Sequence, residues 1–187
     1  SNFANVSSRL NGNQTMVSDK EVLLIGGIYG IHALRDGSPV QVYETRQDVF
    51  KIHPAETAGW FNASVNKHIV QFSPIKGESR VLTNDLPDIA ADFALDDTGR
   101  LWISTWSKGL LVAQPSNQGP VDAEPASLHH GLSANEGYAH VARLADTIIG
   151  IIPHEAYWLN PKTDLFETIP GFPVGNTLVA SNQDDQG

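Results

Sequence analysis

The sequence predicts an all-β fold, a β-propeller fragment of about four four-stranded blades plus the first strand of a fifth. First, four segments each carry an apolar strand, a short turn and a second apolar strand. The residues before the second strands are Gly30, His68, Gly109 and Ala156, spaced by 38, 41 and 47 positions. Second, this period of about 42 residues matches the roughly 40–50 residues of a propeller blade. Third, helical periodicity is nearly absent.

The blades are placed in order by alternating apolar residues and by turn signals. Asp97-Thr98-Gly99, for example, lies between two alternating strands and predicts a hairpin turn, because glycine adopts a positive φ angle without steric cost. The four blades are expected over residues 15–44, 49–83, 90–129 and 138–169, and the last strand of the third blade at 126–129. A fifth blade would start at 177–187.

The sequence ends in an acidic turn, Asp184-Asp185-Gln186-Gly187, directly before the strand that the repeat places next. A chain that stopped there would leave an unpaired strand edge. We therefore expect a fragment of a longer propeller. Two alternatives stay open: a four-bladed ring closed by residues 177–183, and a homodimer in which two copies associate edge to edge.

One repeat carries a recognisable set of motifs: Leu86-Pro87, then Asp96-Asp97-Thr98-Gly99, then Leu101-Trp102-Ile103-Ser104-Thr105, and finally Gly109-Leu110. This pattern resembles the two-component regulator propeller repeat, with Ser104 in place of the usual glycine. The neighbouring repeats match less well. The next one keeps His130-Gly131-Leu132 but lacks the tryptophan and the acidic turn.

The resemblance implies an extracytoplasmic, periplasmic sensor domain of a bacterial receptor. In such receptors the propeller is followed by a membrane-anchored signalling module, a histidine kinase or a diguanylate cyclase. The resemblance therefore implies that this chain senses a signal, carries no enzymatic activity of its own and has two partners: a ligand and the rest of the receptor.

Composition excludes several other classes. The chain of 187 residues has 12 basic and 21 acidic residues and a net charge of −9, so it lacks the basic surface that nucleic acids or anionic membranes require. With no cysteine, disulfides, cysteine-based zinc sites and thiol nucleophiles are excluded. No apolar run approaches the ~18–20 residues of a membrane span, and no signal peptide is recognisable, so any such segment is expected outside this chain.

The sequence predicts neither a metal nor another cofactor. His129 and His130 are the one histidine pair, and neighbouring strand residues point to opposite faces. Asp96-Asp97 and Asp184-Asp185 lie in turns, where aspartate bonds to its own backbone. An enzyme, a propeller lyase or hydrolase, is the alternative that would need Glu155, His154 and His130 to converge. A protein-interaction scaffold is a further alternative, which would expose a flat apolar patch.

Tryptophans and turns supply the candidate site residues. Trp102 and Trp60 are expected in the core, packed between blades. Turns between the second and third strands of the blades gather at one end of a propeller, where several loops can surround a ligand. The candidates for binding a small molecule or saccharide at these turns are Tyr29, Asn66, Lys67, Trp106, Lys108, His154 and Glu155.

Overall fold

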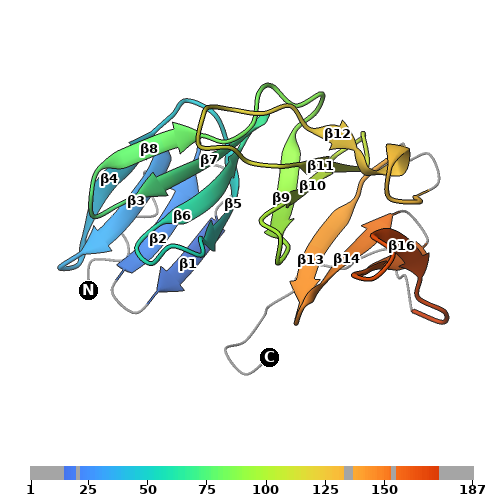
Figure 1. Ribbon diagram of the computed structural model, residues 1–187. Coiled ribbons are helices and arrows are strands. Elements are labelled where there is room, and N and C mark those ends of the chain that lie inside the picture. The colour runs from blue at the N-terminus through green and yellow to red at the C-terminus, as the bar shows by residue number, and fades with distance from the viewer. Residues whose placement is uncertain (1–14, 20–21, 133–136, 153–154, 173–187) are drawn as a thin grey trace. The chain divides into compact units, whose positions relative to one another are not determined.

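The computed structural model describes residues 15–19, 22–132, 137–152 and 155–172. Over these residues the chain forms sixteen β-strands in four antiparallel sheets of four strands (Figure 1). Each sheet is a simple meander in which consecutive strands are neighbours: β1 to β4, β5 to β8, β9 to β12 and β13 to β16. We refer to these sheets as blades one to four.

The strands of the first two blades begin and end as follows. Blade one contains β1 (Thr15–Asp19), β2 (Val22–Gly27), β3 (Gly30–Arg35) and β4 (Ser38–Glu44), and blade two contains β5 (Val49–Pro54), β6 (Phe61–Val65), β7 (His68–Ser73) and β8 (Glu78–Val81). Asp36 and Gly37 join β3 to β4, and both have positive φ angles, +49° and +76°. This is the conformation of a two-residue hairpin turn, which explains the aspartate–glycine pair at this position.

Blade three contains β9 (Ala90–Leu95), β10 (Leu101–Thr105), β11 (Leu110–Ala113) and β12 (Glu124–Pro125), and blade four contains β13 (His140–Leu144), β14 (Thr147–Ile152), β15 (Glu155–Asn160) and β16 (Leu165–Thr168). The prediction of a strand at 126–129 is wrong. The last strand of blade three is Glu124–Pro125, and Ala126–Leu128 form a 3-10 turn, η1. Pro125 has no N–H to donate to a longer ladder, which favours a short edge strand.

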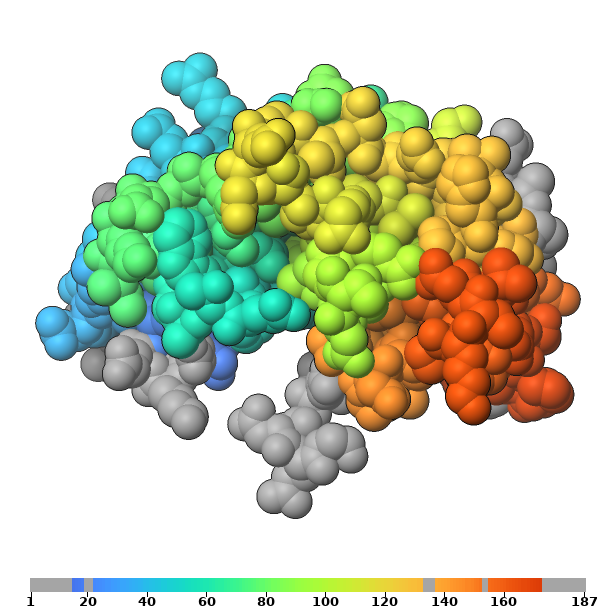
Figure 2. All heavy atoms as spheres, in the orientation of Figure 1, coloured from blue at the N-terminus to red at the C-terminus, as the bar shows by residue number. Residues whose placement is uncertain are grey.

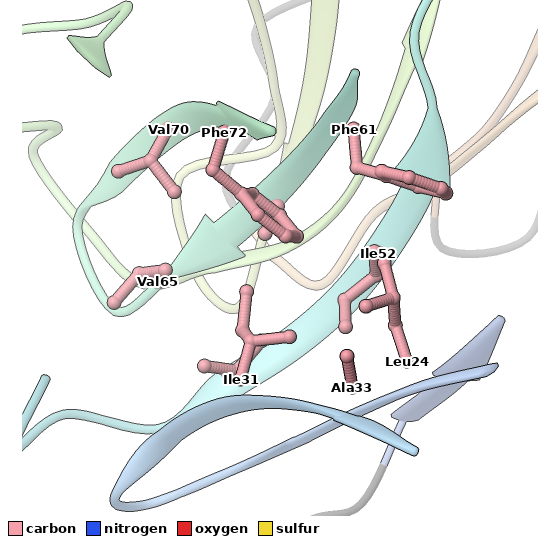
Figure 3. Packing of buried hydrophobic residues seen from close by; sticks show 10 residues of the cluster. Leu24, Ile31, Ala33, Ile52, Phe61, Val65, Val70 and Phe72 are labelled. Carbon is pink, nitrogen blue, oxygen red and sulfur yellow. The ribbon is translucent and has the colours of Figure 1, made fainter. Parts of the chain in front are cut away.

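The chain divides into two compact units, Ser1–Asp85 and Leu86–Gly187, and the first holds blades one and two. Their facing sides form an apolar core that includes Leu24, Ile31, Ile52, Phe61 and Phe72. Figure 3 shows these side chains pointing toward one another from strands of both blades. Alternate residues of each strand enter this core, as expected for a sheet that buries one face.

The second unit holds blades three and four. Its core includes Trp102 and Leu110 from blade three and Ile148, Leu159 and Phe166 from blade four. In Figure 2 the atoms of these two blades, coloured from yellow-green to red, form a continuous surface. The expected all-β architecture with four four-stranded sheets is confirmed, while the expected start of a fifth blade, 177–187, lies outside the described residues.

Candidate functional site

In the first unit, the turn between β2 and β3 presents Tyr29 to solvent, with 58% of the residue exposed. The following residue, Gly30, has a φ angle of +115°, and a Cβ atom there would collide with the carbonyl oxygen of Tyr43. Gln41 donates a hydrogen bond to the carbonyl of Tyr29 at 2.8 Å. The turn is thus fixed by a glycine and by blade one's outer strand, with the tyrosine ring outside.

Asn66 and Lys67 form the equivalent turn of blade two, between β6 and β7. Asn66 has a φ of +49°, which asparagine tolerates better than most residues, and its N–H donates to the carbonyl of Asp48 at 3.0 Å. Both turn residues are half-buried. The conformation of the turn therefore explains the asparagine at position 66. Of the β2–β3 turn and the β6–β7 turn, the second alone carries a basic residue, Lys67.

In the second unit, the loop from β10 to β11 carries Trp106 and Lys108. Asp88, at the entry to β9, accepts hydrogen bonds from the N–H and hydroxyl of Ser107 at 2.6 and 2.9 Å. The hydroxyl of Thr105 accepts the N–H of Lys108 at 2.9 Å. The loop backbone is held at several points, while Trp106 stays 47% exposed.

The entry to β13 lies directly beside this loop. The N–H of Gly137 donates to the carbonyl of Ser107 at 2.9 Å, and the N–H of Ala139 donates to the carbonyl of Thr105 at 3.2 Å. Between them, Tyr138 is 46% exposed, and its ring meets the ring of His140 edge to face at 4.6 Å. Burial of part of the ring, with the negative charge of Asp92, raises the pKa of the Tyr138 hydroxyl.

Glu155 opens β15 at this same end of blade four, since it lies opposite Ile152, next to the pair His140–Ile151. Its carboxylate accepts a hydrogen bond from the hydroxyl of Tyr157. We call this end of the second unit the loop end and define it by Asp88, Trp106, Lys108, Tyr138, His140 and Glu155. His154, also predicted for this site, lies outside the described residues.

Three of the predicted residues, Trp106, Lys108 and Glu155, thus lie at the loop end. Tyr138, His140 and Asp88 were not predicted from the sequence. Their signal was available: each lies in or next to the segment that enters an innermost strand, and these entries share one end of a blade with the turns that were selected. Tyr29, Asn66 and Lys67 belong to the other unit.

The opposite end of the second unit carries a polar network that we call the turn-end clasp, defined by Asp96, Asp97, Arg100, His130, Arg143 and Asp164. Asp96 is buried and accepts the indole N–H of Trp102 at 2.8 Å and the Nε–H of Arg100 at 2.7 Å. Arg100 also donates two hydrogen bonds, at 2.8 and 2.7 Å, to the carboxylate of Asp164 in blade four.

The clasp lowers the pKa of two of its carboxylates, Asp96 and Asp164, and so favours their charged form. Burial by itself would raise the pKa of Asp96, but hydrogen bonds from Thr98, Trp102 and Arg100 together bring that pKa below its ordinary value. Hydrogen bonds from Arg100 lower the pKa of Asp164. The carboxylates of Asp96 and Asp164 accept hydrogen bonds from side chains that hold the two blades together. Their role is therefore structural, and they do not act as an acid or a base.

The two tryptophans expected in the core differ. Trp102 is completely buried. Trp60 does not take the core position expected for it: it is half-buried, it lies one residue before β6, and the ammonium group of Lys76 lies 5.5 Å from its ring centre. The next residue, Phe61, is the one that is buried in the core. Neighbouring residues of a strand point to opposite faces, so a prediction that is wrong by one residue selects the wrong side chain.

The structure does not bring together the acid–base set of the enzyme alternative. Glu155 lies at the loop end, whereas the Nδ1 of His130 lies 2.9 Å from the carbonyl oxygen of Asp164, beyond the far end of β15. At ~3.3 Å per residue, these ends of β15 are about 16 Å apart. His129 lies 3.4 Å from Glu124, and the described residues contain no group of three or more metal-ligating side chains.

Neither a family model nor a curated protein matches the sequence. The structure is similar to the extracellular domain of a putative one-component system from B. thetaiotaomicron, with a TM-score of 0.65 and 17% identity over 90% of this chain and 23% of that one. A structure described as the same domain of a putative hybrid two-component system gives a TM-score of 0.64 and 16% identity, over 85% and 22%. The chain thus spans about a quarter of either structure.

The chain is also similar to the WD40 β-propeller domain of Doa1, with a TM-score of 0.54 and 11% identity over 82% of this chain and 52% of that one. In the part of the chain that the structure describes, no helix has the length and hydropathy needed to cross a membrane. The fold is that of a β-propeller, and its likeness to extracellular domains of a two-component system is consistent with the resemblance to the two-component regulator propeller repeat.

Proposed function

We propose that this chain is part of a periplasmic sensor propeller, which binds a ligand and passes the signal to a membrane-anchored histidine kinase or diguanylate cyclase without catalysing a reaction itself. One observation carries the proposal: a chain with a near-consensus regulator propeller repeat is similar in structure, over 90% of its length, to an extracellular domain of a putative signalling system. A propeller fold shared with such extracellular domains supports this function.

The loop end of the second unit is the ligand site in this proposal. Trp106 and Tyr138 are two large aromatic residues, each nearly half exposed, on segments joined by backbone hydrogen bonds. Exposed aromatic rings stack on the apolar faces of sugar rings, and their polar edges stay hydrated. Lys108 and Glu155 are exposed and add a donor and an acceptor for hydroxyl groups. This set fits a saccharide.

Preorganisation supports the assignment. The β10–β11 loop needs no rearrangement to present Trp106, because Asp88 and Thr105 already hold its backbone. A rigid loop loses little conformational entropy on binding. A ligand that contacts both this loop and the entry to β13 would favour the conformations in which blades three and four keep this spacing, and such a shift in population can be transmitted to a following module.

Isothermal titration of the chain with a panel of neutral, acidic and amino-substituted oligosaccharides tests the proposal. We expect one class to bind, Trp106→Ala and Lys108→Ala to weaken it at least tenfold, and Lys162→Ala, an exposed lysine in the β15–β16 turn, to leave it unchanged. Tyr29→Ala reports whether the first unit contributes. Binding that survives combined replacement of Trp106, Lys108 and Tyr138 by alanine would overturn this site.

A further inference from the structure

The innermost strands of blades three and four, β9 and β13, lie next to each other in the second unit. Both run from the loop end toward the turn-end clasp, and Figure 1 shows their arrows pointing the same way. The segment that contains β9 leads from Asp88 to Asp97, and the segment that contains β13 leads from Tyr138 to Arg143. These two strands therefore connect the candidate ligand site with the clasp.

At the loop end, both strands are bonded to the β10–β11 loop. The N–H of Trp106 donates to the carbonyl of Ile89, which precedes β9, at 3.3 Å. The N–H of Ala139, which precedes β13, donates to the carbonyl of Thr105 at 3.2 Å. The spacing between Trp106 and Tyr138 thus depends on where the entry to β13 lies against blade three.

At the clasp, the guanidinium group of Arg143 joins the same two strands. Its Nε–H donates to the carbonyl of Ala145, in the hairpin of its own blade, at 3.1 Å. It reaches blade three through a hydrogen bond to the carbonyl of Leu95, the last residue of β9, at 3.4 Å, and through an ion pair with Asp97. A planar guanidinium with five donors can hold these three acceptors together.

The strand β13 carries this constraint to the loop end. Tyr138 lies five residues before Arg143, which is about 16 Å at ~3.3 Å per residue. The strand is paired with β14 from His140 to Leu144, so it cannot stretch, and a shift at Arg143 moves Tyr138 by about the same distance. A binding site becomes too loose when its side chains stand about 1 Å from the productive position.

We propose that Arg143 is a positioning residue of the ligand site. Its ion pair with Asp97 aligns β13 with blade three, and this alignment sets the spacing of Trp106 and Tyr138. Arg143 touches no ligand in this arrangement and acts through the strand alone. The inference rests on the proposed function, because the site that Arg143 aligns is the loop end.

The other ion pair of the clasp supplies a matched control. Arg100 of blade three pairs with Asp164, which lies in the β15–β16 turn. This turn joins the two outer strands of blade four, and β14 separates them from β13. Loss of this pair should therefore leave the entry to β13 in place.

Amide hydrogen exchange, measured by NMR on the isotopically labelled chain, tests the proposal without a ligand. The amide of Ala139, a completely buried residue, reports on the contact between the entry to β13 and blade three. The amide of Ile169, which donates to a carbonyl within blade four at 2.8 Å, reports on the blade itself. In Arg143→Gln we expect the exchange rate of Ala139 to rise about fivefold relative to that of Ile169. Asp97→Asn should give the same pattern, and Asp164→Asn should leave the ratio of the two rates unchanged.

A second measurement is the titration with the oligosaccharide panel. Arg143→Gln should weaken the class that the wild type binds by about three- to tenfold, whereas Asp164→Asn should not change the affinity. An equal rise at Ala139 and Ile169 would mean that Arg143 only stabilises the blade, and an unchanged rate at Ala139 would mean that it does not hold the entry to β13. Either result overturns the proposal.

The two measurements also separate this inference from the proposed function. If Trp106→Ala weakens binding and Arg143→Gln does not, the ligand site stands and the positioning role of Arg143 is overturned. If no oligosaccharide of the panel binds to the wild type, the proposed function fails, and the exchange rates still decide whether Arg143 aligns β13 with blade three.

Discussion

The joints between blades differ in the two units. In the first unit, blades one and two meet mainly through apolar and aromatic side chains: Phe61 and Phe72 stack with ring centres 5.9 Å apart, and Tyr43 meets Phe72 at 6.1 Å. Arg35 of blade one also donates a hydrogen bond to the carbonyl of Pro74 in blade two, at 2.6 Å. In the second unit, the apolar core around Trp102 is joined by the turn-end clasp. Apolar burial and a hydrogen bond to a backbone carbonyl join the blades of the first unit, so the two ion pairs of the clasp contribute something more.

That contribution is register. Blade three supplies Arg100 to Asp164 of blade four, and blade four supplies Arg143 to Asp97 of blade three. Each blade thus gives one cation and one carboxylate to the joint. Apolar side chains tolerate small shifts of one sheet over another, whereas this exchange fixes one alignment, because sliding would separate both ion pairs together.

The largest effect is expected for Trp102→Ala. Removing a completely buried tryptophan should lower the free energy of unfolding by about 3–5 kcal/mol. It also removes a donor from the buried carboxylate of Asp96, so the loss should exceed that of Phe61→Ala in the first unit. Urea titration followed by far-ultraviolet circular dichroism measures both variants.

Trp102→Phe separates the two contributions, since it keeps an aromatic ring and removes the indole N–H. We expect a loss of about 1–2 kcal/mol from the missing hydrogen bond. If Trp102→Ala and Phe61→Ala cost the same, and Trp102→Phe costs nothing, the two joints rest on burial alone and the contrast between the units fails.

Asp96→Asn comes next. The Oδ2 atom of Asp96 accepts hydrogen bonds from Trp102 and from Arg100. In asparagine an amide nitrogen can take its place, and this nitrogen is itself a donor, so it cannot accept either hydrogen bond. We expect a loss of about 1–3 kcal/mol in the free energy of unfolding. Asp36→Asn is the matched control, because Asp36 is exposed in a hairpin turn with a φ of +49° that asparagine also adopts. Equal effects in both variants would contradict the role of Asp96.

The clasp also predicts a pH dependence for the second unit. The pKa values of Asp96 and Asp164 are lowered in the folded state, so the unfolded state binds more protons in acid. The stabilisation is present above the unfolded pKa of about 3.9 and is lost as pH falls through the lower folded pKa values. Three of the four tryptophans lie in residues 86–187, so urea unfolding followed by fluorescence between pH 7 and pH 2 reports mainly on this unit.

The matched variant for this experiment is again Asp96→Asn, which removes one of the two carboxylates. Its free energy of unfolding should vary less with pH than that of the wild type. A free energy of unfolding of the wild type that stays constant below pH 4, or that increases as the pH falls, would contradict the lowered pKa values.

The sequence was sufficient to predict the blades because their strands repeat with a fixed period and bury alternate residues. It misplaced Trp60, since the choice between Trp60 and Phe61 depends on one residue of register, which two adjacent aromatics leave undecided. It also misassigned residues 126–129, where apolar Ala126 and Leu128 alternate with polar residues as in a strand, but the chain forms a 3-10 turn after a proline-containing loop.

The candidate site could be predicted in part for a related reason. Turn positions follow from the repeat, so Trp106 and Lys108 were selected directly. Tyr138 and Asp88 were not. Tyr138 joins the loop end because the entry to β13 bonds to a loop of the neighbouring blade, and Asp88 joins it by bonding to Ser107 across its own blade. Sequence spacing does not show which strand entry lies beside which turn. The ion pair of Arg100 with Asp164, 64 residues apart, was missed for the same reason.

The smallest effect is expected for Asp164→Asn. This residue has a φ of +57°, which asparagine tolerates, so the backbone of the β15–β16 turn should not change. The substitution removes the doubly hydrogen-bonded partner of Arg100, but the Asp164 side chain is 51% exposed, and water screens such a pair. We expect a loss of less than about 1 kcal/mol. The wild type should approach the variant's stability in 1 M NaCl, where exposed ion pairs are screened, while the variant should respond less to salt. A loss as large as that of Trp102→Ala, with no dependence on salt, would show that the clasp acts through packing and not through charge.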